Sequence, residues 1–153
     1  MINVDVLSED KKWSKKISKK EDFFNKLLKF FPKKYNFINK KVSLTLLLSN
    51  NKRVKKLNKQ FRNKNKATDI LSFPLQKKVN IKKKPYLGDI IISYNFIDKP
   101  KNQSLKQFKD KVIKTFIHGF LHLLDFDHTK IKDYNKMFKE EQNIYQSVIR
   151  KLY

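Results

Sequence analysis

Cysteine is absent from this 153-residue sequence, histidine occurs only three times and glycine only twice. Without cysteine there can be no disulfide and no thiolate metal site, so a transition metal would have to be bound by imidazole or carboxylate groups. The sequence also lacks an apolar run near the ~18 residues of a membrane span, and its first residues, MINVDVLSED, do not resemble a signal peptide. These absences predict a soluble, cytoplasmic protein with no membrane partner, and we expect no small-molecule cofactor.

Acidic residues are scarce as well, because 14 Asp and Glu stand against 37 Lys and Arg, a formal net charge of +23. Such an excess favours polyanions, since each phosphate that is neutralised releases condensed counterions. Part of the excess reflects a general abundance of lysine beside Asn, Ile and Phe. Only Arg53, Arg62 and Arg150 are arginines. The charge therefore indicates a nucleic-acid partner without identifying it.

Apolar patterning predicts one α+β domain over residues 1–153, a length that suits a single hydrophobic core. Alternating or continuous apolar residues predict the four strands of a small sheet, at 2–7, 42–49, 68–75 and 86–93. Apolar residues at helical spacing predict helices at 105–124 and 131–151 and one that ends before Pro32, and a cap at Ser49 or Asn50 predicts a short basic helix at 51–61. Two capping boxes mark helix starts, Ser18 with Glu21 and Ser104 with Gln107.

The three histidines lie within eleven positions, in the segment HGFLHLLDFDH at residues 118–128. On the predicted helix, His118 and His122 are four residues apart and lie off the apolar stripe. They would be about 6 Å apart along the axis, a spacing at which two imidazoles can chelate one metal ion. A single histidine on a helix more often packs or forms a hydrogen bond, but the clustering of all three favours a metal site. The small neighbours Thr115 and Gly119 are expected to leave space above the pair.

His128 can reach the same ion only if the helix ends before it, because on a continued helix it would point about 120° away. Asp125 offers such an end, since Asp is among the few residues besides glycine that tolerate the left-handed conformation. His128 would then be a third ligand and leave the fourth tetrahedral position for water, as in a catalytic zinc site.

The spacing H-x3-H-x5-H also occurs in zinc peptidases, where a glutamate that serves as general base follows the first histidine. Here Gly119 follows His118. The missing carboxylate and the large positive charge both favour a phosphodiester substrate over a peptide.

Several ordered motifs resemble those of the YbeY-type endoribonucleases, metal-dependent bacterial factors of ribosomal RNA maturation. Besides HGFLHLLDFDH, they are LNKQFRNKNKATDILSFP from residue 57, LGDI from residue 87, and MFKEEQNIY in the last predicted helix. Together they cover about residues 57 to 145 in the order of the family. The sequence departs from the family motif where Asp125 replaces a glycine and Phe126 replaces a tyrosine.

The resemblance implies a small mixed sheet, with a metal site at the end of the central helix. It implies one divalent metal ion of the zinc type, bound by His118, His122 and His128, and catalytic roles for His118 and Arg62. The implied activity is that of a single-strand-specific endoribonuclease in ribosomal RNA processing, at the 3′ end of 16S ribosomal RNA, and in ribosome quality control. The implied partners are ribosomal RNA and the small ribosomal subunit.

Other polar residues near these motifs are candidates for supporting roles. Arg62 has a planar, permanently charged guanidinium that suits a phosphate, although a surface arginine at the end of a basic helix would also fit its position. Asp69, Asp89 and Asp127 could orient the ligand imidazoles or move a proton, and each could equally serve a cap or a turn. The candidate RNA-binding residues are Arg53, Lys55, Lys56 and Lys59 on the helix before Arg62, and Lys77, Lys78, Lys82, Lys83 and Lys84 in the basic connection 76–85, which we expect to be a mobile hairpin loop.

The sequence thus predicts a metal-dependent endoribonuclease and leaves two alternatives open. One is an RNA-binding ribosome assembly factor whose metal ion is structural. The other is a zinc hydrolase of another substrate, a peptidase included. Metal content measured together with RNA and peptide cleavage distinguishes the three.

Overall fold

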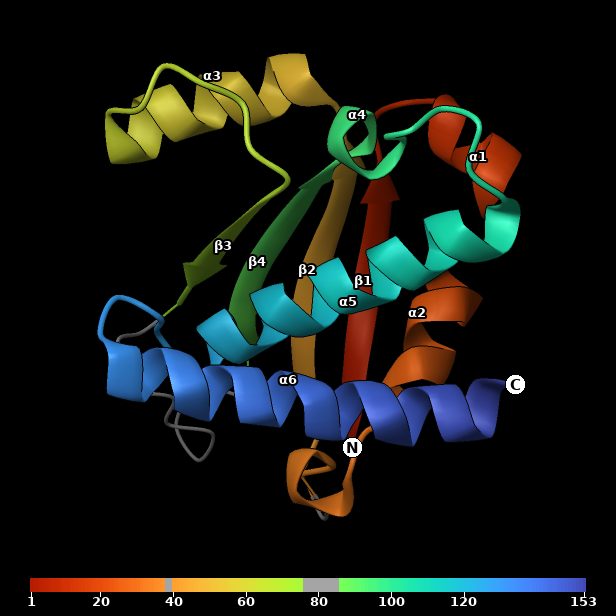
Figure 1. Ribbon diagram of the computed structural model, residues 1–153, viewed down its shortest axis with the longest axis vertical. Coiled ribbons are helices and arrows are strands. Elements are labelled where there is room, and N and C mark those ends of the chain that lie inside the picture. Colours follow the sequence, from red (N-terminus) through yellow and green to blue (C-terminus); the bar gives the residue numbers. More distant parts are fainter. Residues whose placement is uncertain (38–39, 76–85) are drawn as a thin grey trace.

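A four-stranded mixed sheet lies at the centre of the protein, and helices cover both of its faces (Figure 1). The computed structural model describes residues 1–37, 40–75 and 86–153. The strands are β1 (Ile2–Ser8), β2 (Val42–Ser49), β3 (Ile70–Pro74) and β4 (Tyr86–Ser93), in the order β1-β2-β4-β3. β1, β2 and β4 are parallel to one another, and β3 is antiparallel to β4 at the edge. The expected α+β class and small mixed sheet are confirmed.

The helices form one layer on each side of the sheet, with α6 packed outside α5. They are α1 (Lys12–Lys16), α2 (Lys20–Lys29), α3 (Asn51–Arg62), α4 (Tyr94–Ile97), α5 (Leu105–Leu123) and α6 (Ile131–Leu152), with a short 3-10 helix η1 (Lys33–Tyr35). α5 packs on β3 and β4, and α2 packs on β1. α3 covers the opposite face, where Val54 packs with Leu71 and Ile91 in a small apolar cluster. None of the helices described combines the length and apolarity that a membrane crossing requires.

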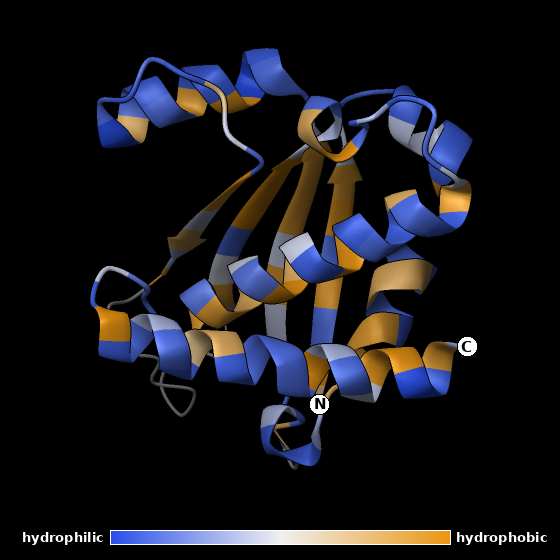
Figure 2. Ribbon diagram, in the orientation of Figure 1, coloured by the Kyte–Doolittle hydropathy of each residue, from blue (hydrophilic) through white to orange (hydrophobic). Residues whose placement is uncertain are grey.

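The inner face of α5 carries the core of the molecule. Phe108, Phe116 and Phe120 are fully buried on it, and Figure 2 shows the hydrophobic residues concentrated on the strands and on the inner faces of the helices. The ring of Phe116 lies 5.1 Å from that of Phe24 on α2, and the ring of Phe120 lies 5.1 Å from that of Phe31. Burying each phenylalanine stabilises the fold by roughly 1.5–3 kcal/mol. This packing fixes the position of α5, and therefore of any group at its end.

The helix starts test the predicted caps. The capping box of Ser104 and Gln107 is confirmed at the start of α5. The box predicted at Ser18 and Glu21 is wrong, because α2 begins after Lys19 and no side chain caps it. The chain before α2 forms another helix, α1, which was not predicted, and both Trp13 in α1 and Ile17 directly after it are buried.

The predicted helices 51–61, 105–124 and 131–151 agree with α3, α5 and α6 within one residue at each end. The strand predicted at 68–75 is shorter than expected, since β3 spans Ile70–Pro74. The basic connection predicted at 76–85, with its candidate RNA-binding lysines, lies outside the described residues.

Candidate metal centre and catalytic cavity

The C-terminal end of α5 is a turn that reverses the chain. Asp125 has a φ of 70°, in the left-handed region, as predicted for the residue that ends this helix. The backbone N–H of Asp125 donates to the carbonyl of His122 at 3.0 Å, and that of Phe126 donates to the carbonyl of Leu121 at 3.1 Å. These are the two bonds of a Schellman turn, in which glycine is the usual left-handed residue, so Asp125 costs about 1–2 kcal/mol there. The turn brings His128 back beside the helix.

The three histidines converge at this turn. One ligand atom from each of His118, His122 and His128 can be chosen so that all lie within 4.8 Å of one another. The Nε2 atoms of His118 and His122 are 3.1 Å apart. Two nitrogens at Zn–N distances of 2.0–2.1 Å on a tetrahedral ion are about 3.3 Å apart. The side chains present therefore fit a divalent ion of the zinc type.

Hydrogen bonds fix the tautomers of the two helical imidazoles. Nδ1 of His122 lies 2.9 Å from the carbonyl oxygen of Phe126, and Nδ1 of His118 lies 2.7 Å from Oε1 of Glu141. Because a carbonyl and a carboxylate only accept hydrogen bonds, each Nδ1 carries the proton and each Nε2 keeps its lone pair. Both Nε2 atoms face the shared position, so the Schellman turn orients a ligand through the carbonyl of Phe126.

The surroundings of His122 lower its pKa and favour the neutral imidazole. Burial lowers the pKa of His122, and the neighbouring His118 and His128 lower it further, against an opposing effect of the hydrogen bond to the Phe126 carbonyl. A lowered pKa means that the imidazole is neutral at pH 7, which is the form that binds a metal.

The three carboxylates expected from the sequence to orient the imidazoles make other bonds. Asp69 and Asp127 each accept a hydrogen bond from the backbone N–H of the next residue, and Asp89 accepts one from the hydroxyl of Tyr86. The bonds of Asp127 lower its pKa, although it is fully exposed. Asp69 and Asp127 do line the cavity in front of the histidines. Among the described residues, the carboxylate bonded to an imidazole of the histidine cluster is instead Glu141.

Glu141, which reaches His118 from α6, was not among the residues predicted from the sequence. Its carboxylate stands in the row of α6 residues that faces α5, followed at intervals of four residues by Tyr145 and Ile149. An acidic residue within such an inward-facing row was the available signal. Its partner could not be read, because the sequence does not show which turn of α6 meets which turn of α5.

A cavity of about 560 Å³ opens in front of the histidine cluster. Its lining joins His118, His122 and His128 to Arg62 and Lys64. Arg62 is the last residue of α3, which ends where Asn63 adopts a left-handed φ of 56°. The structure thus brings a guanidinium from α3 to the same cavity as three imidazoles from α5 and the turn after it, although α3 and α5 lie on opposite faces of the sheet.

The prediction that Gly119 leaves space above the histidines is wrong. Gly119 lies buried against β3. A Cβ atom there would overlap Cδ1 of Ile70 and lie 3.0 Å from Oγ of Ser72. The hydroxyl of Ser72 also donates to the carbonyl of Gly119 at 3.1 Å, which ties β3 to α5 between His118 and His122. A glutamate at position 119, as in zinc peptidases, would therefore require the side chain of Ile70 to move.

The candidate RNA-binding residues on α3 divide into two groups. Lys55, Lys56 and Lys59 are exposed, and Lys59 lies about one turn from Arg62. Arg53 lies near the other end of α3, where its Nε is 3.6 Å from Oε2 of Glu9. Arg53 therefore does not share the cavity of Arg62.

Known proteins are similar to this chain in sequence and in fold. The profile of the family described as Endoribonuclease YbeY matches residues 5–149. An endoribonuclease YbeY from Pelagibacter ubique is 64% identical over 152 residues, 99% of this chain and 99% of that protein. Another from a Sulfurihydrogenibium species is 33% identical over 146 residues, 94% of this chain and 91% of that protein. The solution structure of a Thermotoga maritima protein is similar at a TM-score of 0.56 and 25% identity, over 99% of this chain and 91% of that one.

Proposed function

The chain belongs to the YbeY family of endoribonucleases, and from this premise we propose that it cleaves RNA at internal phosphodiester bonds with the help of a divalent metal ion. The observation that carries the proposal is the convergence of Arg62 and the three histidines on one cavity. At about 560 Å³, this cavity has the size of sites that hold a nucleotide-sized group.

The residues around the cavity divide the work. His118, His122 and His128 would hold the ion, for which zinc is the best match to three imidazoles, and the ion would supply Lewis acidity toward a phosphoryl oxygen. Glu141 and the carbonyl of Phe126 keep two of the imidazoles in the required tautomer.

Arg62 is the candidate to stabilise the charge that develops on the phosphate during cleavage. Its guanidinium is permanently charged and can form two parallel hydrogen bonds to phosphate oxygens. Lys64, which lines the same cavity, and the exposed Lys59 one turn before Arg62 are positioned to bind neighbouring phosphates. Asp69 and Asp127 remain candidates for moving a proton, because both line the cavity.

For the substrate, we propose single-stranded ribosomal RNA, at the 3′ end of 16S ribosomal RNA and during ribosome quality control. The family membership and the net charge of +23 support an RNA substrate, and we propose the small ribosomal subunit as the partner. With such a substrate, we expect the protein to act in the cytoplasm.

The test measures metal content and RNA cleavage in the same preparations. Wild-type protein should bind one divalent ion and cleave ribosomal RNA. His118→Ala and Arg62→Ala should lose cleavage while keeping the fold and the affinity for RNA. Arg150→Ala, which removes an exposed arginine on α6 far along the chain from the cavity, is the matched control and should cleave like the wild type.

Three outcomes would contradict the proposal. Equal cleavage by the wild type and both cavity variants would indicate a contaminating nuclease. Tight RNA binding without cleavage by the metal-loaded wild type would favour an assembly factor with a structural metal. Cleavage of a peptide with RNA left intact would indicate a hydrolase of another substrate.

A further inference from the structure

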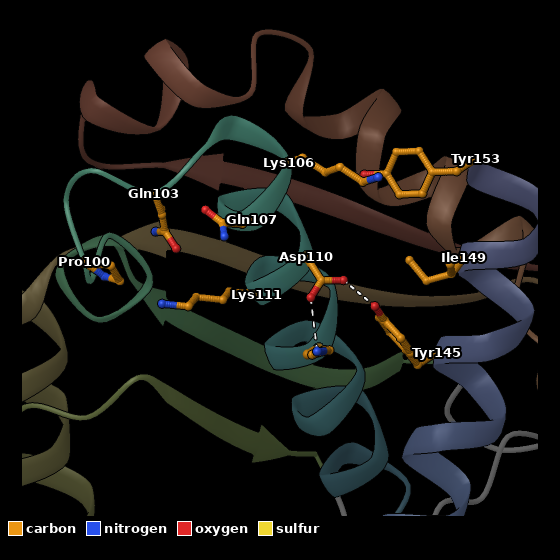
Figure 3. A pocket seen from close by; sticks show the side chains of 10 residues that line it. Pro100, Gln103, Lys106, Gln107, Asp110, Lys111, Tyr145, Ile149 and Tyr153 are labelled. Carbon is orange, nitrogen blue, oxygen red and sulfur yellow. Dashed lines mark hydrogen bonds and ion pairs between the residues drawn. The ribbon is translucent and has the colours of Figure 1, made fainter.

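A second basic cavity lies away from the histidines, between the first half of α5 and the second half of α6 (Figure 3). Its volume is about 610 Å³. Lys106 and Lys111 from α5 lie on one side, and Tyr145 and Ile149 from α6 lie on the other, with Tyr153 directly after α6. We call this cavity the α5–α6 groove.

The groove carries a net positive charge. Its lining includes a single carboxylate, Asp110, which accepts a hydrogen bond from the hydroxyl of Tyr145 at 2.5 Å and pairs with Lys114 at 3.1 Å. Asp110 is thus already engaged. The ammonium of Lys111 donates a hydrogen bond to the backbone carbonyl of Lys99, and among the described residues no carboxylate pairs with Lys106 or Lys111. No acidic side chain neutralises either ammonium, so both keep a positive charge that can attract an anion.

The other wall of the groove is apolar and partly aromatic. Tyr153 is 61% exposed, and the ammonium of Lys106 lies 4.9 Å from the centre of its ring. The ammonium of Lys114 lies 4.9 Å from the ring of Tyr145. Aromatic faces beside cations are the combination that binds single-stranded nucleic acid, because bases stack on the rings and phosphates pair with the cations.

The groove and the histidine cluster lie along the same helix, α5, and α6 contacts both. Glu141, which bonds to His118, precedes Tyr145 by one interval of four residues on the same face of α6. Along α5, Lys111 lies about 10 Å and Lys106 about 18 Å from His118, at 1.5 Å per residue. A stacked strand at about 3.4 Å per nucleotide covers these distances in roughly three to five nucleotides.

We propose that the α5–α6 groove is a second RNA-binding site, which holds a single-stranded segment of the substrate several nucleotides from the bond that is cleaved. The segment places phosphates on Lys106 and Lys111 and a base against Tyr153. This inference rests on the proposed endoribonuclease function, and it adds a length requirement: RNA that ends short of the groove binds only at the catalytic cavity.

The test compares two double variants of equal charge change. Lys106→Glu with Lys111→Glu alters the groove, and Lys29→Glu with Lys33→Glu alters two exposed lysines outside its lining. The substrates are single-stranded RNAs of about 6 and about 20 nucleotides with the same cleavage site. Tyr153→Ala tests the stacking wall with no change of charge, and thermal unfolding verifies that each variant is folded.

For the longer RNA, the groove variant should raise KM about tenfold or more and leave kcat within about twofold. The control pair should raise KM at most about twofold, and Tyr153→Ala should raise it about threefold. For the shorter RNA, the groove variant should match the control pair. The slope of log affinity against log salt should fall by about 1.4 for the longer RNA, since two phosphate contacts are lost at about 0.7 each.

Equal losses from the groove and control pairs would overturn the inference, because they would reflect net charge alone. An equal loss of affinity for the short and the long RNA would overturn it too. So would a groove that is saturated by a free nucleoside monophosphate and gives the long RNA no advantage over the short one. If the wild type cleaves no RNA, the proposed function fails separately. The affinities of the metal-free proteins for the longer RNA then decide whether the groove binds RNA.

Discussion

Replacing Glu141 by glutamine should weaken metal binding without unfolding the protein. Oε1 of Glu141 lies 2.7 Å from Nδ1 of His118, and the carboxylate is 26% exposed, so its charge acts on the imidazole through a partly desolvated bond. Glutamine keeps an acceptor oxygen at this position but loses the charge, which makes the imidazole a weaker donor to a cation. Removing such a partner typically lowers metal affinity ten- to a hundredfold, or about 1.4–2.7 kcal/mol.

The neighbouring residue provides the control. Glu140 points to the other side of α6, where it accepts hydrogen bonds from Lys34, at 2.8 Å, and from Tyr35. Glu140→Gln removes the same charge from the same turn of the helix without touching a histidine. It should leave the affinity for the ion within about twofold of the wild-type value.

The assay is competition for Zn²⁺ with a chromophoric chelator, read as the dissociation constant of the protein-bound ion. It reports on binding whether or not the protein is active. If Glu141→Gln holds the ion as tightly as the wild type, the carboxylate does not orient His118. If Glu140→Gln loses as much affinity as Glu141→Gln, the effect is one of net charge and the geometric argument is wrong.

Three further predictions concern the packing, the pH response and the chemistry. Gly119→Ala should lower the free energy of unfolding by about 1–3 kcal/mol in urea, because its Cβ overlaps Ile70, and an unchanged midpoint would contradict the close packing of α5 on β3. Burial tends to raise the pKa of Glu140, but the hydrogen bonds from Lys34 and Tyr35 outweigh it and lower that pKa. The pairing therefore stabilises the fold above the unfolded pKa of about 4.3, and this stabilisation is lost as pH falls through the lowered pKa of the folded state. At pH 6 the Glu140→Gln variant should unfold at a lower temperature than the wild type, and in acid the two unfolding temperatures should converge. Arg62→Lys keeps the charge but loses the planar fork, so kcat for RNA cleavage should fall at least about tenfold with KM nearly unchanged, and full activity would show that charge alone suffices.

The extent to which the sequence predicts this fold depends on how local each signal is. The apolar stripe of α5 and the capping box at Ser104 are properties of one segment, and the structure confirms both. The left-handed turn at Asp125 follows from a stretch of six residues and is confirmed as well. Helix α1 was missed because it is five residues long and its burial depends on Trp13, whose indole donates to the distant carbonyl of Ser49 at 2.9 Å.

The parts of the site that escaped prediction depend on contacts between elements. Glu141 meets His118 only because α6 packs on α5 in one register, which no local pattern specifies. Gly119 was misinterpreted for a similar reason: it lies at the border of the apolar stripe, and only the position of Ile70 on β3 shows that this border is filled. The α5–α6 groove could not be predicted either, because its lining depends on which residues of α5 and α6 face each other.

The local origin of the three histidines has a consequence for the order in which the molecule assembles. All three belong to α5 and the turn that ends it, so their convergence needs no contact between distant parts of the chain. Contacts of short sequence separation have a low entropic cost of closure and can form early in folding. If these histidines hold an ion, it would bind to α5 early, whereas Arg62 would join the cavity only after the sheet has closed between α3 and α5. The cavity would then be completed from its histidine end, and an ion bound early would favour the native end of α5 over its continuation as a longer helix.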